Sequence, residues 1–141
     1  GESLKTSDPQ AMLATQGGNV TAVIWDFEQP DQKVSDRPFY TKLIPAHAAA
    51  SVELQVTHLA PNTAYRVEVY RTGYHSNDAY SAYIELGSPK ALTAAQIAHL
   101  NELTRDLPAT GKVMQSGAAG TVELTVPMNS NDIVLVKLER D

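Results

Sequence analysis

The 141-residue sequence predicts an all-β fold: a Greek-key β-sandwich of the immunoglobulin or fibronectin-III type, with one or two short helices inserted near residues 78–105. Three observations support this prediction. Apolar and polar residues alternate over several short segments, as they do in strands with one buried face. Clusters of Gly, Pro, Asn and Ser separate these segments. The spacing L-x-P-x-T-x-Y, from Leu59 to Tyr65, lies between two of them.

Six segments have the pattern of strands: residues 11–15, 20–27, 51–57, 65–70, 121–126 and 133–138. Segment 20–27 is apolar on both faces, so we expect a central strand that is covered on two sides, with Trp25 packed in the core. Turns that contain glycine are expected at 16–19 and 117–120, because glycine adopts positive φ without steric cost. The stretch 28–45, which holds three prolines, is predicted to be a loop.

The spacing from Leu59 to Tyr65 is that of a tyrosine corner. In fibronectin-type and immunoglobulin-like sandwiches this tyrosine is buried near the start of a strand, and its hydroxyl bonds to the backbone of the preceding turn. We therefore expect Tyr65 to be buried and Leu59 to lie in the core. The motif indicates a fold and says nothing about function.

Two helices are predicted between the strands. Residues 78–86 have room for about two turns, and Gly87 follows as a stop signal. Thr93 and Gln96 have the spacing of a capping box. We expect the second helix, over 94–105, to pack onto the sandwich through an apolar face formed by Ile97, Leu100, Leu103 and Leu107.

The composition limits the possible partners. A net charge of -5 argues against nucleic acid and against an anionic membrane surface, since both require clustered Lys and Arg. The absence of cysteine excludes disulfides and thiolate metal sites, and it leaves periplasmic, secreted and cytoplasmic locations open. We expect one sandwich domain over 1–141, with 1–10 as a flexible or linking segment. Because the chain begins at Gly1, we interpret it as a fragment of a longer parent.

Catalytic patterns are weak in this sequence. A retaining glycosidase needs two carboxylates about 5 Å apart. Asp26 and Glu28 lie two residues apart and could share a face, but the simpler interpretation is that acidic residues lead from a core strand into a solvated loop. The single Asn-Glu pair, at Asn101, falls in the predicted helix. No metal-binding spacing joins the four histidines, which are His47, His58, His75 and His99. We therefore predict no catalytic residue, no cofactor and no metal site.

One loop, residues 70–80 (YRTGYHSNDAY), interleaves aromatic rings with Arg, His and Asn. Such residues can stack on sugar rings and hydrogen-bond to hydroxyls. Alternatively, the loop caps the next helix or docks on a neighbouring domain, and we favour docking or capping over free carbohydrate binding. The candidate contact residues are Arg71, Tyr74, His75, Asn77 and Tyr80.

Several of these stretches, taken together, resemble a known family. They are residues 20–27 (VTAVIWDF), 65–71 (YRVEVYR), 75–80 (HSNDAY), 86–89 (LGSP) and 92–96 (LTAAQ). From about Val20 to Leu138 the chain is similar to the C-terminal β-sandwich of glycoside hydrolase family 39, the β-xylosidase and α-L-iduronidase group. The resemblance implies a parent that hydrolyses xylosides or similar glycosides in a (β/α)₈ barrel. Since such a barrel needs about 250 residues, no catalytic residue can be assigned here.

The leading hypothesis is therefore a non-catalytic accessory domain whose partner is the catalytic barrel of its parent chain. One alternative is an independent carbohydrate-binding module that holds xylo-oligosaccharide or another glycan through Tyr74 and Tyr80. Another is a fibronectin-III-like adhesion or interaction module. The helix predicted at 94–105 counts against that last alternative.

Overall fold

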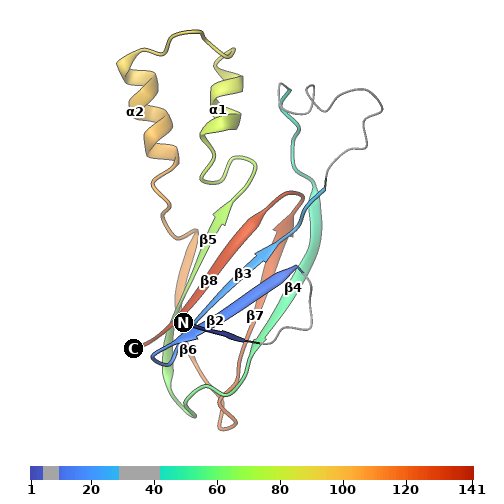
Figure 1. Cartoon of the computed structure of the whole chain (residues 1–141), viewed down its shortest axis with the longest axis vertical. Coiled ribbons are helices and arrows are strands. Elements are labelled where there is room, and N and C mark those ends of the chain that lie inside the picture. Colours follow the sequence, from blue (N-terminus) through green and yellow to red (C-terminus); the bar gives the residue numbers. More distant parts are fainter. Residues whose placement is uncertain (5–9, 29–41) are drawn as a thin grey trace.

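Two antiparallel sheets pack face to face in this computed structural model, which describes residues 1–4, 10–28 and 42–141 (Figure 1). The larger sheet has six strands, in the order β1 (Glu2–Leu4), β2 (Ala11–Gln16), β3 (Asn19–Trp25), β8 (Ile133–Arg140), β5 (Ala64–Thr72) and β6 (Thr110–Gln115). The smaller sheet pairs β4 (Ala48–Val56) with β7 (Val122–Asn129). The predicted all-β sandwich is confirmed.

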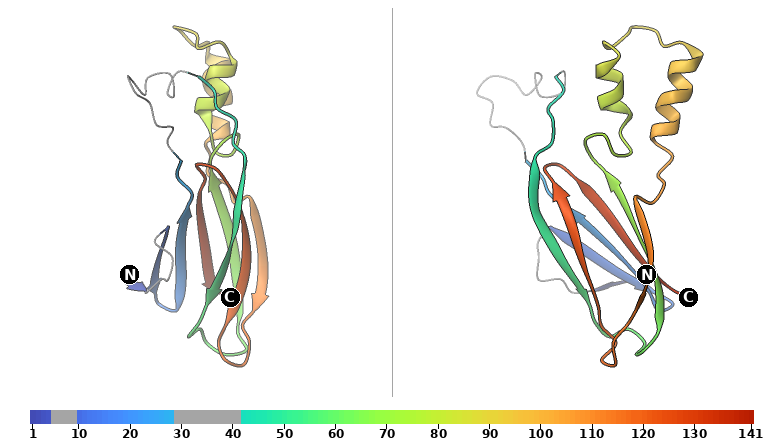
Figure 2. Two further views of the ribbon diagram at one scale, coloured as in Figure 1. Left: turned by 90° about the vertical axis from the view of Figure 1, so that its right-hand side faces the viewer. Right: turned by 180° about the vertical axis from the view of Figure 1, so that it is seen from behind.

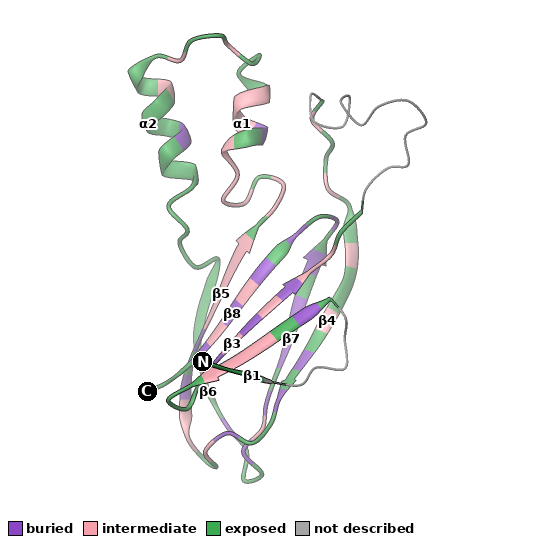
Figure 3. Cartoon of the chain, viewed as in Figure 1, coloured by how far each residue is buried: buried purple, intermediate pink, exposed green. Residues whose placement is uncertain are grey.

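The core lies between the two sheets and follows the alternation of the sequence (Figure 3). Every second residue of β7 is buried, and the same period runs through most of β3 and β8. The largest fully buried side chains include Tyr65, Ile24, Leu138, Val67 and Val126. Each such side chain contributes roughly 1.5–3 kcal/mol when it leaves water.

The strand β3 is central, as predicted, but only one of its faces is buried. Val20, Ala22 and Ile24 point into the core. Trp25, which we expected in the core, is only half-buried, and Phe27 lies beyond the strand with 68% of its surface exposed. The reason is that, within the described residues, no layer lies on the face of the six-stranded sheet that is turned away from β4 and β7; we call this the outer face (Figure 2).

Two edge strands, β1 and β6, were not predicted from the sequence. Residues 2–4, which we assigned to a flexible or linking segment, pair with β2, and Ser3 lies opposite Ala14. The strand β6 pairs with β5, and only Met114 of its six residues is half-buried. Because β6 is almost wholly exposed, its sequence carries little of the alternation by which strands are recognised.

The tyrosine corner is confirmed. Tyr65 is 1% exposed, and its hydroxyl accepts a hydrogen bond from the Ala60 N–H at 3.1 Å. Leu59 is buried in the core. The buried Ser116, which follows β6, stabilises the same turn. Its hydroxyl donates to the Ala60 carbonyl at 2.6 Å and accepts from the Thr63 N–H at 2.9 Å.

The helices α1 (Ala79–Glu85) and α2 (Ala94–Leu103) form a hairpin that projects from one end of the sandwich (Figure 1). The predicted capping box is present, with Thr93 as the N-cap. The expectation that α2 packs onto the sandwich is wrong, because α2 packs against α1 beyond the ends of the strands. Leu100 is the buried residue of α2, whereas Ile97, Leu103 and Leu107 are exposed. Among the described residues, no helix has the length and apolar character needed to cross a bilayer.

Replacing Tyr65 by Phe tests the tyrosine corner. Tyr65→Phe leaves the Ala60 N–H without its acceptor, and we expect the free energy of unfolding to fall by about 1–3 kcal/mol. Urea denaturation measures the loss. Tyr70→Phe is the matched control, because the Tyr70 hydroxyl donates to Glu68 at the outer face, where water replaces the lost partner. Equal losses for the two variants would contradict the role assigned to Tyr65.

Candidate functional site

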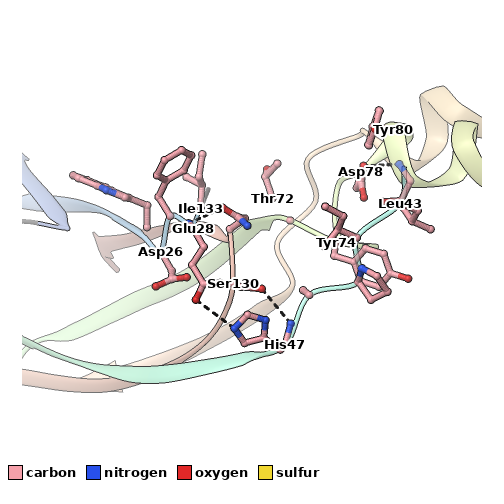
Figure 4. A pocket seen from close by; sticks show the side chains of 18 of the residues that line it. Asp26, Glu28, Leu43, His47, Thr72, Tyr74, Asp78, Tyr80, Ser130 and Ile133 are labelled. Carbon is pink, nitrogen blue, oxygen red and sulfur yellow. Dashed lines mark hydrogen bonds and ion pairs between the residues drawn. The ribbon is translucent and has the colours of Figure 1, made fainter. Parts of the chain in front are cut away.

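A pocket of about 920 Å³ lies at the end of the sandwich where the helices project; we call it the end pocket (Figure 4). Four segments form it: the end of β3 with the residues that follow, residues 42–47, the stretch from the end of β5 into the start of α1, and the stretch from the turn after β7 to the start of β8. Its apolar lining comes from Trp25, Phe27, Leu43, Ile44, Tyr74, Tyr80 and Ile133. Its polar lining includes Asp26, Glu28, Lys42, His47, Asp78, Ser130 and Asn131.

Two of the five candidate contact residues line the end pocket. They are Tyr74 and Tyr80, and Tyr80 is 47% exposed. Arg71, His75 and Asn77 do not line it. The structure therefore divides the loop into residues that face the pocket and residues that hold the loop in shape.

Arg71 turns inward and forms an ion pair with Asp132, in the turn between β7 and β8. The exposed fractions of the two side chains are 16% and 2%. Arg71 also donates to the Pro127 carbonyl, and Asp132 accepts from the Asn129 N–H at 2.8 Å. Gly73 lies so close that a Cβ there would overlap the Asp132 carboxylate. This ion pair joins the end of β5 to the turn after β7.

His75 and Asn77 shape the loop itself. Both have positive φ, at 59° and 50°. The His75 Nε2 lies 2.7 Å from Glu85 Oε1, and its ring stacks on Tyr74 at 4.0 Å between centroids. The Asn77 side chain donates to Thr72 Oγ1 at 3.0 Å. These contacts fix the position of Tyr74 at the pocket.

Asp78 is the N-cap of α1. Its carboxylate accepts hydrogen bonds from the Ser81 N–H at 3.0 Å and from the His75 N–H at 3.2 Å. Burial on its own would raise the pKa of Asp78, but the hydrogen bonds from Ser81, His75 and Tyr80 outweigh burial and hold the pKa below its ordinary value. The pocket wall therefore carries an ionised carboxylate at neutral pH.

The opposite wall is tied to the turn between β7 and β8. The His47 N–H donates to Ser130 Oγ at 3.1 Å, and the His47 imidazole lies 3.3 Å from a Glu28 carboxylate oxygen (Figure 4). The Glu28 N–H donates to Asn131 Oδ1 at 2.9 Å. The predicted loop over 28–45 is described here only at Glu28 and 42–45, and the remainder of that prediction lies outside the described residues.

Asp26 holds a buried polar atom without a partner. Its N–H donates to the Asp132 carbonyl at 3.0 Å, which fixes the backbone beside the ion pair of Arg71. Its Oδ2 is buried and has no hydrogen-bond partner among the described residues. The sequence indicated that Asp26 and Glu28 are both solvated loop residues. For Asp26 this is only partly right, because one of its carboxylate oxygens is buried.

Apart from Tyr74 and Tyr80, the apolar lining of the end pocket was not predicted from the sequence. Ile44 and Ile133 are each at least half exposed, although a strand pattern places Ile133 in a buried segment. The available signal was the adjacency of Trp25 and Phe27 to two acidic residues at a strand end. In the described part of the chain, no group of three or more His, Cys, Asp or Glu residues is arranged to hold a metal ion.

No family model matches the chain, and no curated protein sequence matches it significantly. Among solved structures, a GH39 enzyme from Xanthomonas axonopodis pv. citri is 43% identical over 99% of this chain, with a TM-score of 0.90, and 27% of that enzyme is covered. A monomeric β-xylosidase from Caulobacter crescentus CB15 is also 43% identical over 99% of this chain, with a TM-score of 0.89 and 28% of its own length covered. The chain fits a small C-terminal domain of GH39 proteins.

A further GH39 β-xylosidase, from Caulobacter crescentus, is 31% identical over 99% of this chain, with a TM-score of 0.73 and 24% of its own length covered. A bacterial orthologue of human α-L-iduronidase, at 15% identity and a TM-score of 0.65, shares the fold. The GH39 domain described here thus spans about a quarter of the length of the GH39 structures that it matches.

Adding a methyl group at Gly73 tests the ion pair of this GH39 domain. In Gly73→Ala the new Cβ displaces the Asp132 carboxylate, and we expect the free energy of unfolding to fall by about 1–3 kcal/mol or more. Gly111→Ala is the matched control, because nothing lies within 4 Å of a Cβ at Gly111. Urea denaturation of both variants measures the difference. A Gly73→Ala variant as stable as Gly111→Ala would contradict the close packing.

The N-cap of α1 predicts that the stability of the chain depends on pH through Asp78. Asp78→Ala removes the N-cap, and we expect it to cost about 0.5–2 kcal/mol at about pH 7. Because the folded pKa of Asp78 is lowered, its stabilisation is fully present above the ordinary pKa of 3.8 and fades as the pH falls through the lower folded pKa. Thermal unfolding followed by circular dichroism, at about pH 7 and about pH 2, measures the change.

Thr93→Ala is the control for this experiment, since Thr93 caps α2 with a hydroxyl that does not titrate. Its effect is expected to be the same at both pH values. If Asp78→Ala were as damaging at about pH 2 as at about pH 7, the ionised carboxylate would not be the source of the stabilisation.

Proposed function

We propose that this chain is the non-catalytic accessory β-sandwich of a β-xylosidase-like glycoside hydrolase and packs on the catalytic domain of its parent. One observation carries the proposal: the match at 43% identity covers 99% of this chain but only 27% of a GH39 enzyme. Most of that enzyme therefore lies outside the part that corresponds to this chain.

The chemistry of the end pocket supports a non-catalytic role. A retaining glycosidase uses two carboxylates about 5 Å apart, and one of them needs a raised pKa to act as the acid. The pKa of Asp78 is lowered instead, because its carboxylate is committed to the cap of α1. The Glu28 carboxylate is engaged by His47. Two of the three carboxylates that line the pocket are therefore held by other groups, and the role of the third, Asp26, is tested by substitution.

The loop over 71–80 is the proposed contact with the catalytic domain. Tyr74 and Tyr80 face outward at the end pocket and supply the contact surface, whereas Arg71, His75 and Asn77 hold the loop in position. The α1–α2 hairpin extends beyond the sandwich at the same end (Figure 2). Its exposed Ile97 and Leu103 give it an apolar surface with which it reaches the catalytic domain and lines the approach to the active site.

An activity assay tests the proposal. We expect the purified chain to hydrolyse no aryl β-xyloside, and the full-length parent to hydrolyse it at rates typical of enzymes, from about 1 to 10³ per second. Active-site titration of the parent gives the fraction of active enzyme, against which any trace activity in the preparation of the chain alone is compared. Turnover by the chain alone that a single carboxylate substitution abolishes, such as Asp26→Asn or Glu28→Gln, would overturn the non-catalytic role.

A second candidate is an independent carbohydrate-binding module. The specific observation in its favour is that Trp25, Phe27, Tyr74 and Tyr80 line one pocket together with carboxylates, a combination suited to sugar rings and hydroxyls. Binding of xylo-oligosaccharide by the chain alone separates this candidate from the first.

A further inference from the structure

The outer face of the six-stranded sheet carries an apolar area at the end that lies nearest the end pocket. Because successive residues of a strand point to opposite faces, the sequence neighbours of the buried core residues point outward. Two cross-strand rows of these outward residues are almost wholly apolar. We call their apolar members the outer patch: Met12, Val23, Leu135 and Tyr70 in one row, and Trp25 and Ile133 in the other.

The outer patch is open to water. Met12 is 66% exposed and Ile133 is 53% exposed, and the other four side chains are half-buried. No layer of the described residues covers this face (Figure 2). Soluble monomers rarely expose contiguous apolar patches, and the cores of protein interfaces are depleted in charge and enriched in aromatic residues and methionine. The outer patch therefore has the composition of an interface core.

A polar row limits the outer patch on one side. In this row Thr21 lies opposite Lys137, and Lys137 lies opposite Glu68. The Lys137 ammonium is 4.6 Å from the centroid of the Tyr70 ring, and the Tyr70 hydroxyl donates to Glu68 at 2.7 Å. These charged groups form the rim that an apolar interface needs.

On its other side the outer patch is continuous with the end pocket. Trp25 and Ile133 line that pocket, and they lie opposite each other on β3 and β8. Alternate residues of a strand are about 7 Å apart. Val23 and Leu135 are therefore one such step further from the pocket. A surface that docks at the end pocket and extends over the sheet by this distance covers them.

Since this inference rests on the proposed function, the occupant is sought in the rest of the parent chain. Most of the length of the matched enzymes lies outside the part that corresponds to this chain. A glycan fits the outer patch less well, because Lys137 lies over the Tyr70 ring and Glu68 engages its hydroxyl. A second copy packed sheet on sheet would bury the middle of the outer face. Lys137 and Glu68 lie there, whereas the apolar residues lie toward one end.

We propose that the catalytic domain of the parent packs on the outer patch through an uncharged apolar surface, and that this interface ends at the row of Lys137 and Glu68. The contact at the end pocket then continues along the sheet. The half-exposed residues of β2, β3 and β8 become the buried core of one interdomain interface.

Oxidation of Met12 by dilute hydrogen peroxide measures whether the outer patch is covered. Peroxide must reach the sulfur to form the sulfoxide, and peptide mass spectrometry follows each methionine separately. We expect Met12 to be oxidised roughly 10-fold more slowly in the full-length parent than in the chain alone. Val113→Met is the matched control, because Val113 is 61% exposed on β6 and lies outside the outer patch. A methionine there should be oxidised at the same rate in both proteins.

Leu135→Lys places a charge in the middle of the outer patch. A charge that becomes buried without a partner opposes docking, so in the parent the oxidation of Met12 should rise to within about threefold of its rate in the chain alone. Thr21→Lys adds the same charge in the polar row and should leave Met12 protected. Urea denaturation of the chain alone shows that each variant is folded. The comparison of the unsubstituted proteins does not depend on these variants.

The outcomes separate this inference from the function on which it rests. If Met12 is oxidised equally fast in both proteins while the amides of 71–80 are protected from hydrogen exchange in the parent, the outer patch is not an interface and docking at the end pocket stands. If neither is protected, docking at this end is also wrong.

Three further results would overturn the inference. One is a Leu135→Lys parent, folded, in which Met12 stays protected. Another is protection of Met12 in the chain alone as its concentration is raised, because a second copy then covers the patch. The third is protection of Met12 in the chain alone by xylo-oligosaccharide, which makes the patch a glycan site.

Discussion

The buried ion pair between Arg71 and Asp132 determines how this end of the molecule is built. It joins the end of β5 to the turn between β7 and β8. The loop that follows β5 is thereby linked to the opposite wall of the end pocket. Removing two charges from water is expensive, and hydrogen bonds from Asn129 to the Asp132 carboxylate offset part of that cost. The absence of a side chain at Gly73 gives the carboxylate its space.

Because Arg71 is committed to the interior, the loop that follows presents its aromatic residues outward. Asn77 and His75 make local contacts that hold the backbone in positive-φ conformations, and Tyr74 and Tyr80 line the end pocket. The rigid part of the sandwich thus supports an apolar, acidic surface that its own described residues leave uncovered. A surface of this kind fits an accessory domain that works by packing against a larger partner.

Predictions from sequence succeeded where one local interaction or period decides the structure. Tyr65 was recognised by a spacing that needs only one turn and one hydroxyl. The capping box of Thr93 depends on residues three positions apart. Predictions failed where distant neighbours decide. An apolar helix face such as that of Ile97 packs on whichever element lies near it in the folded chain. Here the long connection between β5 and β6 places α2 beyond the sandwich.

The sequence by itself determined the strands of the core, the tyrosine corner and the capping box of α2, since alternation, spacing and capping are properties of neighbouring residues. It also predicted that the loop over 71–80 is a contact region, and that assignment stays a prediction. Only the tertiary structure decided which residues of that loop face outward, and that Asp26, Phe27 and Ile133 meet them in one pocket. Asp26 and Phe27 follow one strand, and Ile133 begins another strand that is far away in the sequence. No local pattern records which ends of the strands lie side by side.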